Sequence, residues 1–155
     1  MTLTVGSTVE ELITDNIVST IAAIDGVGWN TTIPAGNVTE MDVDPLDQPT
    51  FPMVAVFHGG TPTTHLPLGE QKSAIYWVVL ALEAGSATPR TDINRFIADV
   101  ETALHQTFNR GGNARDTLVD HSEIQTRTLE DPIIQATLKV RVTFAHPFGD
   151  PTTPK

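Results

Sequence analysis

The chain has 155 residues, of which 39% are hydrophobic and only 18% charged, a balance typical of a single folded domain spanning residues 1–155. Nineteen acidic residues against nine Lys and Arg give a net charge of −10, which argues against nucleic-acid binding because phosphate contacts require clustered cations. The absence of cysteine excludes disulfides, thiolate catalysis and Cys-ligated metals. No apolar run approaches the roughly 20 residues of a membrane helix, and the N-terminus lacks the features of a signal peptide, so we expect a soluble protein made in the cytoplasm.

The N-terminal third predicts one helix followed by irregular chain. Apolar residues recur at helical spacing, Ser7 and Glu10 form a capping box and a glycine supplies a stop, so we expect a helix from about 7 to 25. Residues 27–33 favour a short strand. The proline- and acid-rich stretch 34–52 predicts a long surface loop.

Two central segments, 53–58 and 73–83, are apolar on both faces and predict strands. The segment between them, 59–72, begins with Gly, Thr and Pro and predicts a second long loop. A second helix is expected from about 92 to 108, capped by Thr91, because its apolar residues fall within about a third of the helix circumference.

Two strands are expected near the C-terminus. The first covers 117–129 and is bent or bulged near His121, and residues 130–132 form the turn. The second, Ile134 to Phe144, alternates strictly between apolar and polar side chains, which is the strongest strand signal in the chain. The tail, 147–155, holds three prolines and is expected to be extended.

This order of elements predicts an α+β fold, with a mainly antiparallel β-sheet flanked by two principal α-helices in a single domain. Adjacent strands joined by short turns pair in the antiparallel sense. The large aromatic residues mostly lie in apolar strand runs, so we expect them to pack in the core; they are Trp29, Phe51, Phe57, Tyr76 and Trp77.

No segment predicts a catalytic, cofactor-binding or metal site. Asp42, Asp44 and Asp47 superficially suggest a calcium loop, but the sixth position from Asp42 is Asp47 rather than Gly and the twelfth is Met53 rather than Glu. No nucleophile, phosphate-loop or dinucleotide motif occurs, so we expect that the chain is not an enzyme.

The histidines show neither an HExxH motif nor a helical pair four residues apart; they are His58, His65, His105, His121 and His146. His58 and His65 flank a glycine-rich segment and could meet in space, but no third metal ligand is indicated. His105 lies beside the apolar stripe of the second helix, where a surface role is expected.

Burial of the central strands poses a geometric problem. If both helices lie on one side of the sheet, the other apolar face of 53–58 and 73–83 has no cover within a simple two-layer fold. Either the sheet folds over itself or a neighbouring subunit covers it, because large exposed apolar patches usually mark interfaces. With no active site evident, self-assembly is the leading hypothesis.

The polar face of the last strand carries two adjacent cations, Lys139 and Arg141. They are expected either to be solvated or to meet acidic groups, within the hairpin or across a subunit boundary. The candidate partners are Glu123, Glu130 and Asp131.

Five segments occur in a familiar order: a capped helix ending at Asp25-Gly26, FPMVAVF (51–57), SAIYWVVLALEAG (73–85), DINRFIADVETALHQTF (92–108) and LEDPIIQATLKVRVTF (129–144). This order and hydrophobic texture resemble the small tail-terminator, or tail-completion, proteins of long-tailed bacteriophages, including the tail-to-head joining proteins. The similarity covers about Val9 to Phe148. It includes no diagnostic motif, so no functional residue is carried over by position.

The resemblance implies a virion structural protein at the head-proximal end of the tail. Such proteins form hexameric rings that cap the tail tube, stop its polymerisation and meet the head connector or neck protein; they can stay monomeric until they reach the tube. DNA would pass through the ring without specific binding, and no cofactor or membrane is implied. The alternatives are a head–tail neck or head-completion subunit, or a monomeric α+β ligand-binding module or enzyme.

Overall fold

The computed structural model describes residues 8–40, 50–66, 69–85, 87–127, 132–146 and 150–154. These residues hold two α-helices, α1 (Val9–Ala22) and α2 (Pro89–Gln106), and a short 3₁₀ helix, η2 (Arg110–Gly112). They also hold six strands: β1 (Val38–Glu40), β2 (Met53–Gly60), β3 (Thr63–Leu66), β4 (Gly69–Glu83), β5 (Asp116–Arg127) and β6 (Ile133–His146).

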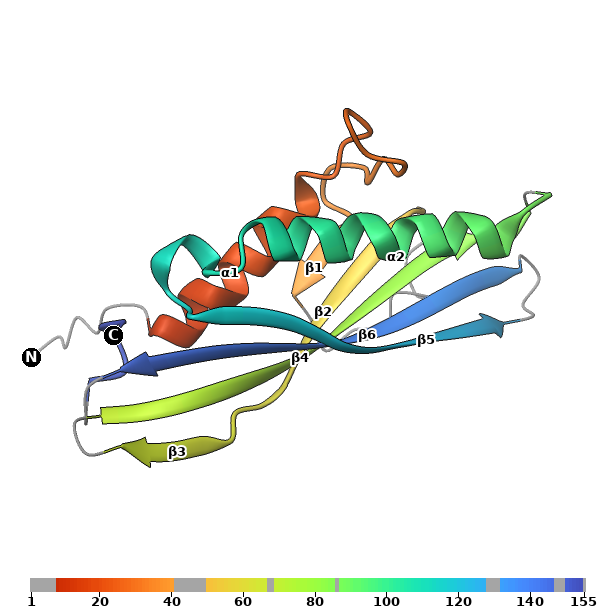
Figure 1. Cartoon of the computed structure of the whole chain (residues 1–155). Coiled ribbons are helices and arrows are strands. Elements are labelled where there is room, and N and C mark those ends of the chain that lie inside the picture. Colours follow the sequence, from red (N-terminus) through yellow and green to blue (C-terminus); the bar gives the residue numbers. More distant parts are fainter. Residues whose placement is uncertain are drawn as a thin grey trace, which may run out of the picture.

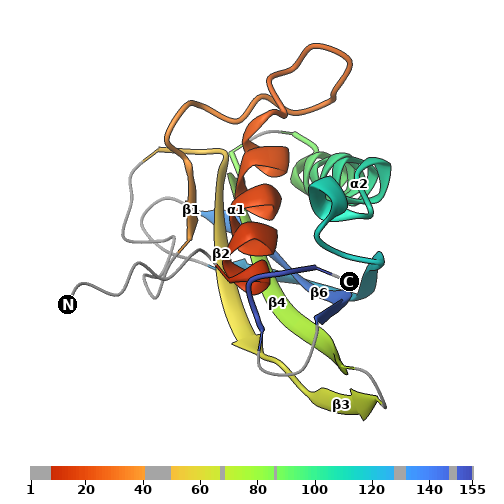
Figure 2. The same ribbon diagram turned by 90° about the vertical axis from the view of Figure 1, so that its left-hand side faces the viewer.

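The strands form one sheet in the order β1-β2-β4-β6-β5, and β3 pairs with the first residues of β4. All pairings are antiparallel except that of β1 with β2. Both helices lie on the same face, α1 nearer β1 and β2, and α2 over the β4–β6–β5 side (Figure 1, Figure 2). The predicted α+β fold, with a mainly antiparallel sheet and two flanking helices, is confirmed.

The main core fills the space between the helices and this face of the sheet. The apolar side of the last strand is entirely buried there, as its alternation predicted; its residues are Ile134, Ala136, Leu138, Val140, Val142 and Phe144. Each fully buried aliphatic side chain contributes roughly 1.5–3 kcal/mol relative to an exposed one. The last strand therefore anchors the helices to the sheet.

The cap of helix α1 lies one residue later than predicted. The capping box is Thr8 with Glu11: the Glu11 N–H donates to the Thr8 hydroxyl at 3.1 Å, and the Thr8 N–H donates to the Glu11 carboxylate at 3.0 Å. The local sequence offers two such boxes offset by one residue, and the predicted one, Ser7 with Glu10, starts outside the described residues. Glu10 is thereby left available for another contact.

Helix α2 begins earlier than predicted, at Pro89 rather than at Asp92, so Thr91 lies inside the helix instead of capping it. Proline fits the first helical turn because its missing N–H would have no partner there and its φ is already helical. The predicted apolar stripe is buried against the core, including Ile93, Phe96 and Leu104.

The prediction of a long loop at 59–72 was wrong. Strand β2 continues to Gly60, β3 follows at Thr63–Leu66, and β4 starts at Gly69, so this segment extends the sheet as a hairpin. Its Gly and Pro residues suggested irregular chain, but the β-branched residues Thr63 and Thr64 suit a strand.

Two N-terminal assignments also differ. Residues 27–33 form bends with a single bridge between Asp25 and Thr32 rather than a strand, and Gly26 and Gly28 adopt positive φ angles that interrupt extended chain. The predicted loop 34–52 contains strand β1, and its residues 41–49, including Asp42, Asp44 and Asp47, lie outside the described residues.

The register of β5 on β6 shifts between Val119 and His121, which confirms the predicted bulge. Of the predicted turn at 130–132, only Pro132 is among the residues that the structure describes. In the tail, residues 150–154 form a turn rather than extended chain, and the Val9 N–H donates to the Pro151 carbonyl at 2.8 Å. This contact seats the tail at the start of α1; residues 147–149 and Lys155 are not among those described.

Within the described part of the chain, neither helix is both long and apolar enough to cross a lipid bilayer.

Candidate functional site

The face of the sheet opposite the helices carries a mixed apolar and cationic surface, which we call the outer patch. It comprises Phe57, Ile75, Trp77, Leu118, Lys139 and Arg141. Trp77 is 39% exposed and Leu118 is 41% exposed, whereas the inward-facing neighbours of Trp77 on β4 are fully buried. The prediction that the aromatic residues pack in the core is therefore confirmed for Tyr76 and wrong for Trp77.

Strand pairing places the outer patch in two rows across the sheet. Phe57, Trp77 and Lys139 are register partners on β2, β4 and β6, and the next row holds Ile75, Arg141 and Leu118. The Lys139 ammonium lies 5.9 Å from the centre of the Trp77 ring, a distance suited to a cation–π contact. The aromatic and cationic side chains thus support one another on an exposed surface.

Arg141 makes an ion pair with Asp120, with 3.3 Å between the guanidinium and the carboxylate. Asp120 is the extra residue of the β5 bulge, so the pairing depends on the register shift. Glu123, one of the three predicted partners, is exposed and makes no ion pair with either cation in the described structure; Glu130 and Asp131 lie outside it.

The position of Trp77 depends on Gly59. A Cβ at residue 59 would lie 2.7 Å from the indole Nε1 of Trp77, closer than side chains tolerate. The indole therefore lies directly against the β2 backbone. Only glycine at residue 59 leaves room for the indole of Trp77 at this place.

At the other end of the same face, Met53, Ala81 and Ile133 are buried and form a small second apolar cluster with Phe51. This end of the sheet face is therefore covered, unlike the outer patch, and the exposed apolar side chains of the face lie in the rows of Trp77 and Ile75.

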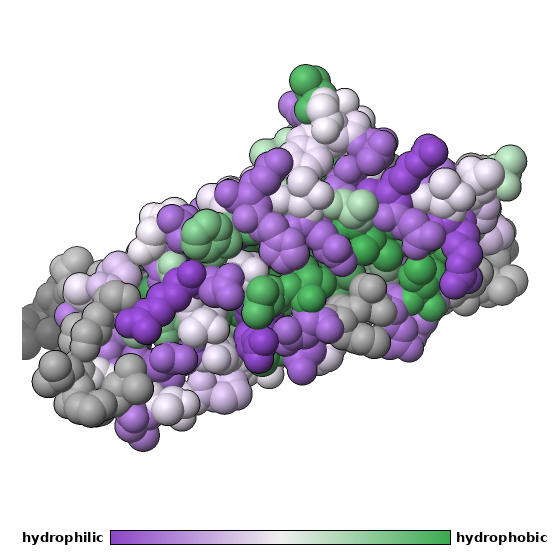
Figure 3. Space-filling model, in the orientation of Figure 1, coloured by the Kyte–Doolittle hydropathy of each residue, from purple (hydrophilic) through white to green (hydrophobic). Residues whose placement is uncertain are grey.

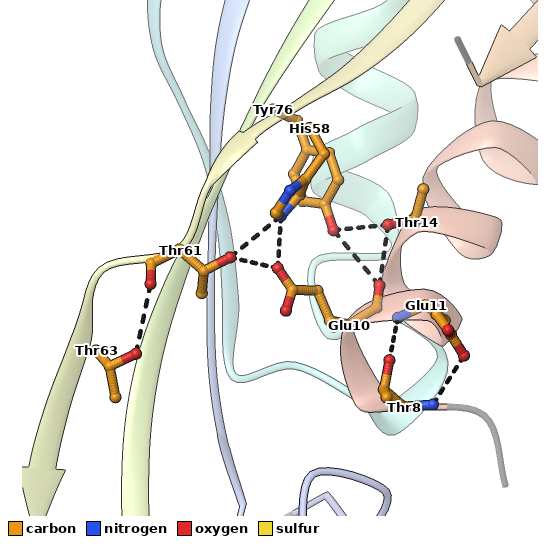
Figure 4. A network of polar contacts seen from close by, with 8 residues as sticks. All are labelled: Thr8, Glu10, Glu11, Thr14, His58, Thr61, Thr63 and Tyr76. Atoms are coloured by element: carbon orange, nitrogen blue, oxygen red, sulfur yellow. Dashed lines mark hydrogen bonds and ion pairs between the residues drawn. The ribbon is translucent and has the colours of Figure 1, made fainter. Parts of the chain in front are cut away.

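A polar network joins α1 to β2 and β4 on the helix side (Figure 4). The His58 Nε2 atom lies 2.5 Å from a carboxylate oxygen of Glu10 and 3.1 Å from the Thr61 hydroxyl, which itself donates to Glu10. All three contacts can be hydrogen bonds if Nε2 carries a proton that it donates to both Glu10 and Thr61.

This geometry does not form a nucleophilic relay. In a Ser/Thr–His–acid triad the hydroxyl and the carboxylate contact opposite nitrogens of the imidazole, so that one nitrogen takes the hydroxyl proton while the carboxylate orients the ring through the other. Here Thr61 and Glu10 both meet Nε2. The arrangement is suited to fastening α1 onto the sheet.

Tyr76 continues the network beneath His58. Its hydroxyl is 2.8 Å from the hydroxyl of Thr14, which donates to the Glu10 carbonyl at 2.9 Å, and its ring meets that of His58 edge-on at 5.1 Å. Burial raises the pKa of Tyr76 well above its ordinary value, partly offset by the hydrogen bond with Thr14. The phenol is therefore neutral and acts as a buried donor.

Beside this network is an open pocket of about 370 Å³ that is rich in carboxylates. Its lining consists of Thr8, Glu10, Glu11, Thr14, Asp15, Glu40 and His58. A second open pocket of about 340 Å³ lies between the 30–32 segment, the end of β4 and α2, and includes Phe51, Leu82 and Arg95. Both volumes fall in the range of ligand pockets, but both pockets are open to solvent rather than enclosed.

A third cluster lies on the β3–β4 hairpin. Glu70 is the register partner of both His65 and His146, and its carboxylate lies 3.5 Å and 3.3 Å from their rings. His58 and His65 do not come together, and His105 is exposed on the last turn of α2. Among the described residues, no group of three or more His, Asp or Glu side chains is arranged to hold a metal ion.

Arg110 is the most unusual buried group. It is fully buried at the start of η2, just after α2, and its guanidinium donates to the Leu104 carbonyl, while its Nε and second terminal nitrogen find no partner among the described residues. Burial lowers the pKa of Arg110 to about 10. No sequence motif marked this residue, because nothing local predicts that an arginine after a helix will turn inward.

Comparison with known proteins finds no family model that matches this chain and no curated protein that matches it in sequence.

Proposed function

We propose that the chain is a virion structural protein of a long-tailed bacteriophage, a tail terminator that forms a ring, hexameric in the family it resembles. The ring would cap the tail tube at its head-proximal end, stop its polymerisation and join it to the head connector. The observation that carries the proposal is the outer patch, where Trp77 stands exposed between Phe57 and Lys139 on a sheet face without helices.

The composition of the outer patch fits a protein-binding surface. Tryptophan and arginine are enriched among the residues that contribute most to protein–protein association, and they act best when water is excluded around them. Trp77 and Arg141 lie in adjacent rows of the sheet, each already oriented by a neighbour. A pre-ordered surface loses little conformational entropy on association.

The charge of the chain suits a channel for DNA. A net charge of −10 on each subunit is multiplied in a ring, and an acidic lumen would repel phosphates and let DNA slide without binding. An assembled channel with a basic wall would contradict this part of the proposal.

Two other functions stay open as alternatives. A head–tail neck or head-completion subunit would use the same kind of ring with different partners. A monomeric ligand-binding module or enzyme would require an enclosed pocket with convergent polar groups, and the two open pockets described above give that function less support.

The test combines mass determination in solution with negative-stain imaging. The chain should be studied alone and with the tail-tube protein encoded in the same genome, because terminators can stay monomeric until they meet the tube. Rings, or caps on tube ends that stop further growth, would support the proposal. A chain that stays monomeric at all concentrations and leaves tube growth unchanged would overturn it.

A further inference from the structure

The charges of this chain divide sharply along the sequence. All nine Lys and Arg residues occur from Lys72 onward, whereas the acidic residues divide almost evenly, nine before Lys72 and ten after it. The first 71 residues therefore carry a formal charge of −9 with no cation, and the remaining 84 carry −1.

The sheet topology turns this division into one between two flanks of the molecule. Helix α1 and strands β1, β2 and β3 all come from the cation-free part of the chain, and β1 forms one edge of the sheet. Strands β5 and β6 and helix α2 come from the later part, and β5 forms the opposite edge. Figure 2 shows α1, β1 and β2 on one side, and α2 with β6 on the other.

The acidic flank holds carboxylates that the fold does not use. In the pocket beside α1, Glu10 is engaged by His58 and Glu11 caps the helix. Asp15 and Glu40 line the same pocket, are exposed, and make no ion pair within the described part of the chain. They project from α1 and from the edge strand β1.

The opposite flank combines cations with apolar surface and with exposed carboxylates of β5: Asp120 is paired with Arg141, and Asp116 and Glu123 are the other two. Arg115 is exposed at the start of β5 and has no ion pair among the described residues, and Arg141 stands on the neighbouring strand. Leu118 is exposed, and Val119 and Ile124 are only partly covered by α2. Figure 3 shows hydrophobic residues gathering on the side where α2 lies over β5.

Electrostatics restricts how two copies can meet. A contact between two acidic flanks would place carboxylates against carboxylates, which costs binding energy. Because every cation lies in the later part of the chain, the acidic flank gains attraction from a neighbour's surface built from that part, and the β5–β6 flank offers Arg115 and Arg141 there.

Strand direction agrees with this contact. Strand β1 runs parallel to β2, and β2, β4, β6 and β5 then alternate in direction, so β5 runs opposite to β1. A second copy in the same orientation would place its β1 antiparallel to β5 of the first. Contacts of this head-to-tail type generate rings when their rotation closes.

We infer that a second copy of this chain binds head to tail, with its α1–β1 flank, carrying Asp15 and Glu40, seated on the β5–β6 flank that carries Arg115 and Arg141. The inference rests on the proposed ring and names the surfaces that join its subunits. The Leu118 side of the outer patch lies next to this contact, and the Trp77 side is left for another partner.

The test uses charge reversal on each flank. Glu40→Lys and Arg115→Glu change exposed residues without a described ion pair, so both variants should fold with wild-type melting temperatures. Glu83→Lys, at the exposed end of the central strand β4, introduces the same charge change as Glu40→Lys away from both sheet edges and serves as its control. Association is measured by sedimentation and negative-stain imaging, alone and on tail-tube ends, at low and high salt.

Each flank variant should weaken association at least about tenfold relative to wild type and to Glu83→Lys. An equimolar mixture of Glu40→Lys and Arg115→Glu should restore it, because alternating subunits then face each other with opposite charges at every junction, in particles of even subunit number.

Normal ring formation by both flank variants would overturn the inference. So would folded variants whose association is weakened and is not restored on mixing. Either result would leave the proposed ring intact. A wild-type chain that never assembles, alone or on tube ends, would instead remove the proposed function itself.

Discussion

The imidazole Nε2 of His58 lies 2.5 Å from a carboxylate oxygen of Glu10, so a direct side-chain contact fastens strand β2 to helix α1. The His58 and Glu10 side chains are 40% and 29% exposed, which limits the strength of the pair through solvent screening. Even so, the contact links residues 48 positions apart, at the point where α1 begins.

We expect Glu10→Gln and His58→Gln each to lower the free energy of unfolding by roughly 0.5–1 kcal/mol. A double-mutant cycle measured by urea denaturation should show positive coupling, because either change alone removes the shared contact. Asp15→Asn, on the exposed side of the same helix, is the control and should change stability by less than about 0.5 kcal/mol. Strictly additive effects would show that the pair contributes nothing.

Tyr76→Phe should cost roughly 0.5–1.5 kcal/mol at neutral pH, because it removes the hydrogen bond to Thr14 in the core. Burial raises the pKa of Tyr76, so the folded state keeps its phenol proton when the unfolded chain, with an ordinary value of 10.0, has begun to lose it. That stabilisation is fully present below pH 10 and is lost as the pH rises further.

Wild type should therefore lose stability above pH 10 more steeply than Tyr76→Phe, and the difference between the two proteins should narrow. Denaturation at a series of pH values checks this, and Tyr76 is the only tyrosine, so phenolate absorbance reports on it alone. A difference that stays constant into the alkaline range would contradict the assignment.

Asp99→Asn should destabilise the protein by about 1–3 kcal/mol. The buried Asp99 carboxylate accepts hydrogen bonds from the Thr31 N–H at 2.8 Å and from the Asn30 side chain at 3.1 Å, which ties the 27–33 segment to α2. Asparagine would replace one of the two accepting oxygens with an NH₂ group, which would then face an N–H donor of Asn30 or Thr31. Glu101→Gln on the same helix is the control, and equal melting temperatures for the two variants would argue against this role.

Leu138→Asp should cost more than about 3 kcal/mol, because it buries a charge without a partner on the helix-facing side of β6. Thr137→Lys, one residue earlier on the opposite face, should be tolerated within about 1 kcal/mol. The comparison tests the assigned faces directly. Similar losses for both variants would show that the sheet is covered on both sides in solution.

Arg110→Met should change stability by less than about 1.5 kcal/mol, because it keeps apolar volume while removing a buried charge with unpaired donors. Arg110→Ala should cost about 2–3 kcal/mol through the cavity it leaves. Burial lowers the pKa of Arg110 to about 10, so the guanidinium is still charged at neutral pH and burying that charge lowers the stability of the folded state. A methionine variant less stable than the alanine variant would show that the guanidinium itself is required.

The sequence by itself determined which residues face the core. Helical spacing in α1 and α2 and strict alternation in β6 identified the buried side of each element, because the geometry of a helix or strand dictates which residues share a face. The bulge near His121 was also predictable. The cap of α1 was missed by one residue, since two overlapping capping boxes compete and packing chooses between them.

Only the tertiary structure decided which faces are covered and which distant residues meet. Alternation shows that Trp77 points away from Tyr76, but not that both helices dock on the Tyr76 side and leave Trp77 exposed. The contact of Glu10 with His58 likewise depends on where α1 lies over β2. The same docking turns a division of charge along the chain into two opposite flanks, because strand order, unlike periodicity, is set by long-range pairing.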